Sequence, residues 1–315
     1  MARGLQRRGR VDVAHDRLCD VRDRARAAFL GLAVGDALGA TVEFMLPSEI
    51  RAEHGIHREI TGGGWLRLAP GHVTDDTEMS LCIARAIAAE DGWSLPAIAD
   101  RFAGWLRSGP TDVGNTCRRG IQRYLHDRSL EAPPNEGDAG NGAAMRMAPV
   151  AIATLADDAL LERRAVEQAH LTHNHPLSDA ACVLVGRMLH LGCLGRGRVS
   201  MLRAAEAAGE RDPALRFAPR RDLAPTAYVA DTMRAVLHAF FQAPTFEECL
   251  VATVNQGGDA DTTGAIAGAI AGACFGPDAI PRRWVKQLDR ALVRELAALS
   301  DRLVDLSPLG RGESP

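Results

Sequence analysis

Two segments of the chain repeat glycine at every fourth position. The segment GLAVGDALG holds Gly31, Gly35 and Gly39, and the segment GAIAGAIAGACFG holds Gly264, Gly268, Gly272 and Gly276. Glycine inside a helix costs about 1 kcal/mol relative to alanine, and this spacing puts every glycine of a segment on one stripe. Close approach of two helix backbones is the natural compensation. We therefore expect two central helices that cross closely and bring Asp36 near residues 259–262.

The rest of the sequence favours helices over strands. Apolar residues recur at helical spacing in residues 79–90, 181–191, 228–241 and 283–305, and alternating β-branched runs are scarce. We predict an all-α protein with short strands at most. A chain of 315 residues is long enough for two domains. The acidic motifs described below come from both halves and are expected to meet, which favours a single domain.

Composition argues against several classes of protein. The net charge of −3 argues against a nucleic-acid binder with a broad basic face. The seven cysteines form no C-x-x-C pair, a pattern typical of reduced thiols in a cytoplasmic protein. No run approaches the about 18 consecutive apolar residues of a membrane-spanning helix. The first ten residues hold four arginines, no acid and no following apolar core, so we expect a disordered extension rather than a targeting signal.

An acidic cluster stands before the helical run at residues 79–90. The sequence VTDDTEMS places Thr74, Asp75 and Asp76 there. A helix N-cap accounts for this motif when it is taken alone, because Thr74 or Asp75 can cap and acids in the first turn complement the helix dipole. Asp75 and Glu78 also have the spacing of a capping box.

The second cluster, NQGGDADTTG, is harder to explain by capping. Asp259 and Asp261 lie in one turn and repel each other, and two glycines before them permit a sharp turn. One capping residue would suffice, so the additional acid needs a partner. No lysine or arginine occurs between residues 251 and 275. We infer that the missing positive charge comes from elsewhere.

A divalent cation supplies that charge. Aspartate and threonine oxygens are hard ligands that suit Mg²⁺ or Mn²⁺. Two clusters, each with two aspartates and a threonine, can hold two ions bridged by carboxylates. Zinc suits these clusters less well, because they contain no cysteine or histidine.

Three further motifs remain open when read from the residues alone. Asp112 lies on a turn in GPTDVGNTCRRG. It is either a residue that stabilises the turn or caps a helix, or a proton donor or acceptor near the metals. His173 lies in HLTHNHP, whose histidine spacing favours a hydrogen bond to a ligand, or plain burial, over a zinc site. Residues 140–142, in EGDAGNGAAMR, offer backbone N–H groups before a helix, which is weak evidence for an anionic ligand.

Together these motifs resemble the ADP-ribosylglycohydrolase family over about residues 27–290. The segments that carry the resemblance are GLAVGDALGATVEF, GHVTDDTEMSL, VGNTCRRGI, GDAGNGAAMR, LTHNHPLSDA and NQGGDADTTGAIAG. The resemblance implies a single-domain orthogonal helix bundle with a dinuclear Mn²⁺ or Mg²⁺ centre in a cleft. It places the domain at residues 23–308, between a basic extension at 1–22 and a flexible tail at 309–315.

The resemblance also implies a role for individual residues. The metal ligands would be Thr74, Asp75, Asp76, Asp259, Asp261 and Thr262. Asp112 matches an essential acid beside the metals. Several residues are expected to bind substrate. Glu43 and His173 would each contact a ribose, the loop of Gly140, Asn141 and Gly142 would face the diphosphate, and Tyr228 would stack on the adenine. Asn115 is expected to bind substrate as well.

The implied reaction cleaves the bond between C1 of a ribose and a guanidinium nitrogen of an arginine side chain. A guanidine anion is a very poor leaving group, so the nitrogen must leave protonated. The two cations would activate the attacking water, and Asp112 is the expected proton shuttle.

Segments such as GGGWLRL and THNHPLSDA point to family members that reactivate the iron protein of nitrogenase. This implies that ADP-ribosylated iron protein is a partner, and that a PII signalling protein and an ammonium channel can hold the otherwise cytoplasmic chain at the membrane. Two alternatives stay open. One is a non-catalytic ADP-ribose-binding homologue. The other is an all-α, Mg²⁺-dependent enzyme that binds diphosphates, which the 4% aromatic content disfavours.

Overall fold

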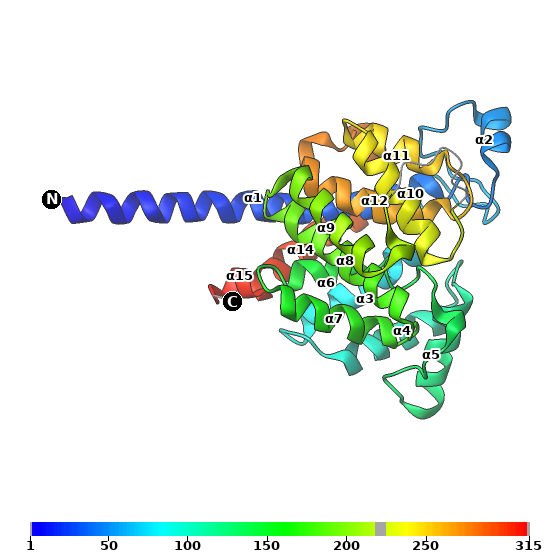
Figure 1. Cartoon of the computed structure of the whole chain (residues 1–315), viewed down its shortest axis with the longest axis horizontal. Helices are drawn as coiled ribbons and strands as arrows, with labels where there is room; N and C mark the ends of the chain where they lie inside the picture. The colour runs from blue at the N-terminus through cyan, green and yellow to red at the C-terminus, as the bar shows by residue number, and fades with distance from the viewer. Residues whose placement is uncertain (1, 218–224, 314–315) are drawn as a thin grey trace.

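The computed structural model describes residues 2–217 and 225–313, and within them every regular element is a helix (Figure 1). Two isolated β-bridges, Gly63 with Leu68 and Gly140 with Tyr228, are the nearest approach to a strand in these ranges. The predicted all-α fold is confirmed. The α-helices are α1 Ala2–Gly39, α2 Pro47–His54, α3 Asp75–Ala89, α4 Leu95–Arg107, α5 Asn115–Asp127, α6 Met147–Ala153, α7 Asp158–His170, α8 Pro176–Cys193, α9 Gly197–Arg211, α10 Val229–Gln242, α11 Phe246–Val254, α12 Ala260–Phe275, α13 Arg282–Val285, α14 Arg290–Leu306 and α15 Pro308–Arg311.

The two glycine stripes face each other across the centre of the molecule. A Cβ added to Gly35 would lie 1.9 Å from the carbonyl oxygen of Gly264, and one added to Gly31 would lie 2.2 Å from that of Gly268. Gly39 lies in the same way against Ala260. Helices α1 and α12 therefore run antiparallel with their backbones in contact, as the spacing predicts. The C-terminal end of α1 consequently meets the N-terminal end of α12.

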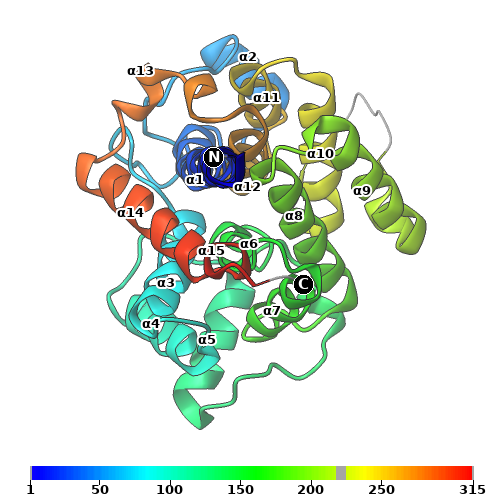
Figure 2. The same cartoon turned by 90° about the vertical axis from the view of Figure 1, so that its left-hand side faces the viewer.

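Other helices enclose this central pair. Figure 2 looks along α1 and shows α14 on one side of the pair, α8 and α10 on the other, and α3 and α6 below. Helix α14 is tied to α1 by ion pairs of Asp301 with Arg26 and of Asp305 with Arg22. These ion pairs join α14 to α1 near the end of the crossing that is remote from Gly39.

Some expected boundaries differ from the observed ones. Gly276 does not lie on the crossing: it has φ of 81° and caps the C-terminus of α12. The apolar stretch 283–305 is divided into α13 and α14, because Asp289 accepts the N–H groups of Ala291 and Leu292 and starts a new helix.

The ends of the chain are helical in the described residues. Helix α1 begins at Ala2 and runs through the segment expected to be disordered, and α15 ends at Arg311. The division at residues 1–22, 23–308 and 309–315 stays a prediction. None of the helices in the described ranges combines the length and apolarity needed to cross a membrane.

Candidate metal centre

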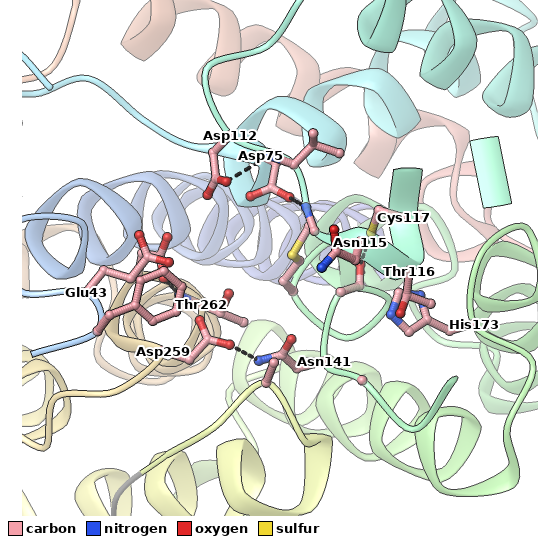
Figure 3. Close-up of a pocket in the computed structure, with 18 of the residues that line it drawn as sticks. Glu43, Asp75, Asp112, Asn115, Thr116, Cys117, Asn141, His173, Asp259 and Thr262 are labelled. Carbon is pink, nitrogen blue, oxygen red and sulfur yellow. Dashed lines mark hydrogen bonds between the residues drawn. The ribbon is translucent and has the colours of Figure 1, made fainter. Parts of the chain in front are cut away.

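The two acidic clusters lie together at the meeting point of α1 and α12 (Figure 3). Asp75 and Asp76 form the first turn of α3, and Asp259 is the N-cap of α12, followed by Asp261 and Thr262. The hydroxyl of Thr262 donates to Oδ2 of Asp76 at 3.3 Å and so joins residues 186 positions apart. The antiparallel crossing brings the clusters together, because it places the start of α12 beside Asp36 and Thr74.

The clusters border a cavity of about 410 Å³. Five of its lining residues are acids, and no lysine or arginine is among the lining residues that the structure describes. Thr74 and Asp76 lie behind this lining and are buried. The described lining residues are Glu43, Phe44, Trp65, Asp75, Asp112, Val113, Gly114, Asn115, Thr116, Cys117, Gly140, Asn141, Gly142, Met145, His173, Ala227, Asp259, Asp261 and Thr262.

Glu43 belongs to the acidic cluster itself. One carboxylate oxygen each from Glu43, Asp259 and Asp261 lie within 4.8 Å of one another, and all three residues are buried. We expected Glu43 to lie at the substrate ribose. Its position beside the aspartates places it where it can contact both a cation and a ligand.

Burial and mutual repulsion favour the protonated form of these acids. Burial, reinforced by Asp112, raises the pKa of Asp75 to about 8. Burial also raises the pKa values of Asp76 and Asp261 well above the ordinary value. Repulsion from Asp36 adds to the shift of Asp76, and repulsion from Glu43 adds to that of Asp261. Among the described lining residues, no cationic side chain offsets this repulsion. Bound cations would offset it and would favour the ionised carboxylates.

The residues present fit such a cation. Oδ1 of Asp76 is buried and accepts no hydrogen bond from any residue that the structure describes. A buried carboxylate oxygen without a partner carries a desolvation penalty that a metal ion removes. The neighbouring donors are carboxylate and hydroxyl oxygens, which suit Mg²⁺ or Mn²⁺.

Asp36 is a site residue that the sequence analysis placed nearby without a role. It is fully buried on α1 and accepts the backbone N–H groups of Thr74 at 3.0 Å and Thr77 at 3.2 Å, together with both hydroxyls. Thr74 is the N-cap of α3, yet its own side chain makes no capping hydrogen bond. Asp36 thus caps α3 from another helix. Its position next to Gly35, near the end of the glycine stripe, was the signal that the sequence offered.

Asp112 lies on the turn before α5, beside the first cluster. The N–H of Gly114 donates to Oδ2 of Asp75 at 3.1 Å, and the N–H of Val113 donates to Oδ1 of Asp112 itself at 2.8 Å. Burial raises the pKa of Asp112, and repulsion from Asp259 adds to the shift. Asn115, the first residue of α5, also lines the cavity. The turn therefore holds a carboxyl group that can carry a proton close to the two acidic clusters.

The loop of Gly140, Asn141 and Gly142 forms another wall. Nδ2 of Asn141 donates to Oδ2 of Asp259 at 2.7 Å, which anchors the loop to the second cluster. The ring of His173 packs against both glycines, and a Cβ at Gly140 would lie 3.0 Å from its Nε2.

A buried arginine orients the ring of His173. The guanidinium of Arg146 donates to the hydroxyl of Thr172 at 2.8 Å, so that hydroxyl is left to donate to Nδ1 of His173 at 2.7 Å. Burial, with repulsion from Arg146, lowers the pKa of His173 well below its ordinary value. The neutral ring therefore carries its proton on Nε2, which faces the glycine loop.

Comparison with known proteins decides the family. The model of the ADP-ribosylglycohydrolase family matches residues 18–312. The chain belongs to the ADP-ribosylglycohydrolase family. The predicted family and its hydrolase class are confirmed.

Relatives of this glycohydrolase match nearly all of it. The ADP-ribosyl-[dinitrogen reductase] glycohydrolase of Rhodospirillum rubrum is 54% identical over 289 residues, which cover 92% of this chain and 98% of that protein. ADP-ribosylarginine hydrolase Tri1 of Pseudomonas putida is 32% identical over 300 residues, covering 91% of this chain and 79% of that one. A solved structure, an ADP-ribosylglycohydrolase-related protein complex, superposes with a TM-score of 0.81 at 35% identity, covering 91% and 99% of the two chains.

Tyr228 lies beside the glycine loop, and its expected role at the adenine stays a prediction. The tyrosine is not among the described lining residues. Its backbone pairs with Gly140 and its side chain is exposed. Two other aromatic residues, Phe44 and Trp65, line the cavity. The sequence analysis gave neither residue a role, although Trp65 lies in the GGGWLRL segment that it singled out.

We predict that the glycohydrolase without metal loses stability as the pH rises. In the folded chain the pKa values of Asp75 and Glu43 are raised to about 8, so between about pH 4 and pH 8 the folded chain binds more protons than the unfolded one. The free energy of unfolding must then fall with rising pH, here by at least about 2 kcal/mol. Thermal unfolding in EDTA at pH 5.5 and pH 8 measures this loss.

Excess Mn²⁺ is the control for that measurement. It is expected to reverse the loss at pH 8, because a ligand that binds only the folded state stabilises it. Equal stability at both pH values in EDTA would contradict the mutual repulsion of these acids.

Proposed function

We propose that this chain removes ADP-ribose from an arginine side chain of dinitrogenase reductase, the iron protein of nitrogenase, and thereby reactivates it. The Rhodospirillum rubrum relative, 54% identical over nearly its full length, is named for action on dinitrogen reductase. The observation that carries the proposal is the contact of Thr262 with Asp76, which unites two acidic clusters at one cavity.

The six proposed metal ligands surround this contact. They are Thr74, Asp75, Asp76, Asp259, Asp261 and Thr262, and they would hold two divalent cations, Mn²⁺ in the first place and Mg²⁺ as the alternative. Such cations, when bound, supply Lewis-acid stabilisation of charge on oxygen and a water that ionises more readily. Oδ1 of Asp76, which accepts no hydrogen bond within the described part of the chain, supports this assignment.

Asp112 is the proposed proton shuttle. Hydrolysis breaks the bond between C1 and the guanidinium nitrogen, joins the oxygen of water to C1 and moves a proton from that water to the departing nitrogen. Burial raises the pKa of Asp112, so this carboxyl group holds a proton more readily than an ordinary aspartate does and can pass it on. Val113 holds one of its oxygens, and the other is left for this transfer.

The remaining walls are proposed to bind the rest of ADP-ribose. The backbone of Gly140 and Gly142, with Asn141 and Asn115, would face the diphosphate, and the Nε2–H of His173 would donate to a ribose hydroxyl. Glu43 would accept from the ribose next to the scissile bond. Tyr228, outside the described lining, stays our candidate for the adenine.

A regulatory setting is also proposed. We infer that the chain works in the cytoplasm and is withdrawn to the membrane through a PII signalling protein bound to an ammonium channel. The lack of a spanning helix in the described residues is consistent with attachment through a partner. Co-sedimentation with channel-containing vesicles, with and without the PII protein, tests this point.

The principal test uses arginine-ADP-ribosylated iron protein. In Mn²⁺ we expect release of free ADP-ribose, seen by mass spectrometry as loss of the modification, with recovery of nitrogenase activity. EDTA should reduce the rate by at least about 10³-fold, since metal activation of water contributes several kcal/mol. Binding of ADP-ribose without release would favour the non-catalytic alternative. Release of inorganic diphosphate from a prenyl diphosphate would favour the alternative of an Mg²⁺-dependent enzyme that binds diphosphates.

A further inference from the structure

Two exposed aromatic rings stand at the mouth of the acidic cavity. Phe44 is 63% exposed and Trp65 is 54% exposed, and both line the cavity. Their ring centroids lie 5.4 Å apart, with the ring planes inclined at 48°. Large exposed apolar side chains are few in the described residues, so a pair of them at the site entrance calls for a ligand.

The backbone holds Phe44 in an unfavourable conformation to display its ring. Its φ is 62°, in the left-handed region that aromatic residues rarely adopt. A hydrogen bond of 2.6 Å from its N–H to the carbonyl of Gly258 fixes this conformation next to the second acidic cluster. Strain of this kind is common where a residue contacts a ligand. A glycine would adopt this turn without strain, so the turn does not explain why a phenylalanine stands at this position.

A carboxylate completes the aromatic pair. Nε1 of Trp65 donates to Oε2 of Glu43 at 2.6 Å, so the indole lies directly beside that carboxylate. An aromatic face next to a carboxylate suits a guanidinium group. The guanidinium plane stacks on the ring, and its N–H groups donate to the oxygens.

The pair lies at the end of the cavity where the leaving group would stand. Figure 3 shows Glu43 on one side of the acidic centre and His173 on the opposite side. Trp65 donates a hydrogen bond to Glu43, whereas the Gly140–Gly142 loop packs against His173. With the diphosphate at that loop, C1 of the ribose and the atom bonded to it point toward Glu43.

We infer that Phe44, Trp65 and Glu43 form a guanidinium subsite that selects arginine as the residue from which ADP-ribose is removed. The inference rests on the proposed function and adds to it the determinant of the linkage. The subsite binds the arginine side chain before cleavage and the protonated guanidinium after it, so it stabilises the departing group.

The test compares a substrate that contains the guanidinium with a product that lacks it. In Phe44→Ala, kcat/KM for ADP-ribosylarginine should fall about 10-fold, the loss expected for one cation–π contact. The Kd for ADP-ribose should stay within about twofold, because that ligand does not reach the ring. Phe44→Tyr should restore the rate, whereas Phe44→Leu, apolar without a π face, should not. Val199→Ala, which removes an exposed apolar side chain from α9 (67% exposed), is the matched control.

Three outcomes would overturn the inference. They are equal loss of both parameters in Phe44→Ala, no loss of either, and full activity in Phe44→Leu. Each of them requires a wild-type chain that hydrolyses ADP-ribosylarginine in Mn²⁺. Failure of the wild type to do so refutes the proposed function and the inference with it, so the two failures are distinguishable.

Discussion

Replacement of Asp112 by asparagine is expected to reduce turnover by about 10²- to 10⁴-fold, the usual contribution of a general acid–base group. Asparagine has the same shape, and its Oδ1 can still accept the N–H of Val113 that holds Asp112 at 2.8 Å. The amide cannot carry the proton that the departing guanidinium nitrogen requires. The affinity for ADP-ribose should therefore stay within a few-fold of the wild-type value.

The measurement separates chemistry from binding. Single-turnover release of ADP-ribose from the modified iron protein reports the chemical step, and calorimetry with ADP-ribose in Mn²⁺ reports affinity. Asp100→Asn is the matched control, because Asp100 is an exposed aspartate on α4 whose partners are Arg128 and Tyr124. Wild-type turnover in Asp112→Asn would show that Asp112 does not transfer the proton. A large loss of affinity would assign it to substrate binding instead.

Replacement of Gly35 by alanine is expected to destabilise the fold by at least about 3 kcal/mol, at the upper end for overpacking. The new Cβ would lie 1.9 Å from the carbonyl oxygen of Gly264 and 2.4 Å from its carbon. Both atoms belong to a helix backbone and cannot rotate away. Relief requires α1 and α12 to separate, which would also move Asp36 and Thr262 apart. We expect loss of Mn²⁺ binding together with the loss of stability.

A glycine on another helix supplies the contrast. Gly104 lies within α4 and a Cβ added there meets no atom within 4 Å. Gly104→Ala should therefore stabilise the chain by about 0.5–1 kcal/mol through helix propensity. Denaturant unfolding of both variants gives the two free energies. Wild-type stability in Gly35→Ala would contradict a backbone contact between α1 and α12.

Residues with a strong local signal were predictable. The glycine stripes predicted the close crossing because repeated glycine destabilises a helix, and close contact with a second helix compensates for that cost. The aspartates at 259 and 261 predicted a need for positive charge because no cation lies near them in the chain. The family motifs supplied the rest, including Asp112 and the loop at residues 140–142, both of which line the cavity.

Residues whose role depends on distant partners were missed. Asp36 caps α3 across 38 residues of sequence, and Arg146 orients His173 through Thr172. Phe44 and Trp65 stand at the mouth of the cavity beside Glu43. None of these contacts follows from the spacing of neighbouring residues.

The sequence by itself determined that the chain is helical, that two of its helices touch, and that two groups of acids lack local partners. Periodicity and local charge are properties of neighbouring residues, so they can be read along the chain. The tertiary structure alone decided that Asp36 caps α3, which oxygen of Asp76 stays without a partner among the described residues, and which aromatic rings face the entrance. Those features depend on the register at which α1 crosses α12, and that register is set by the packing of helices far apart in sequence.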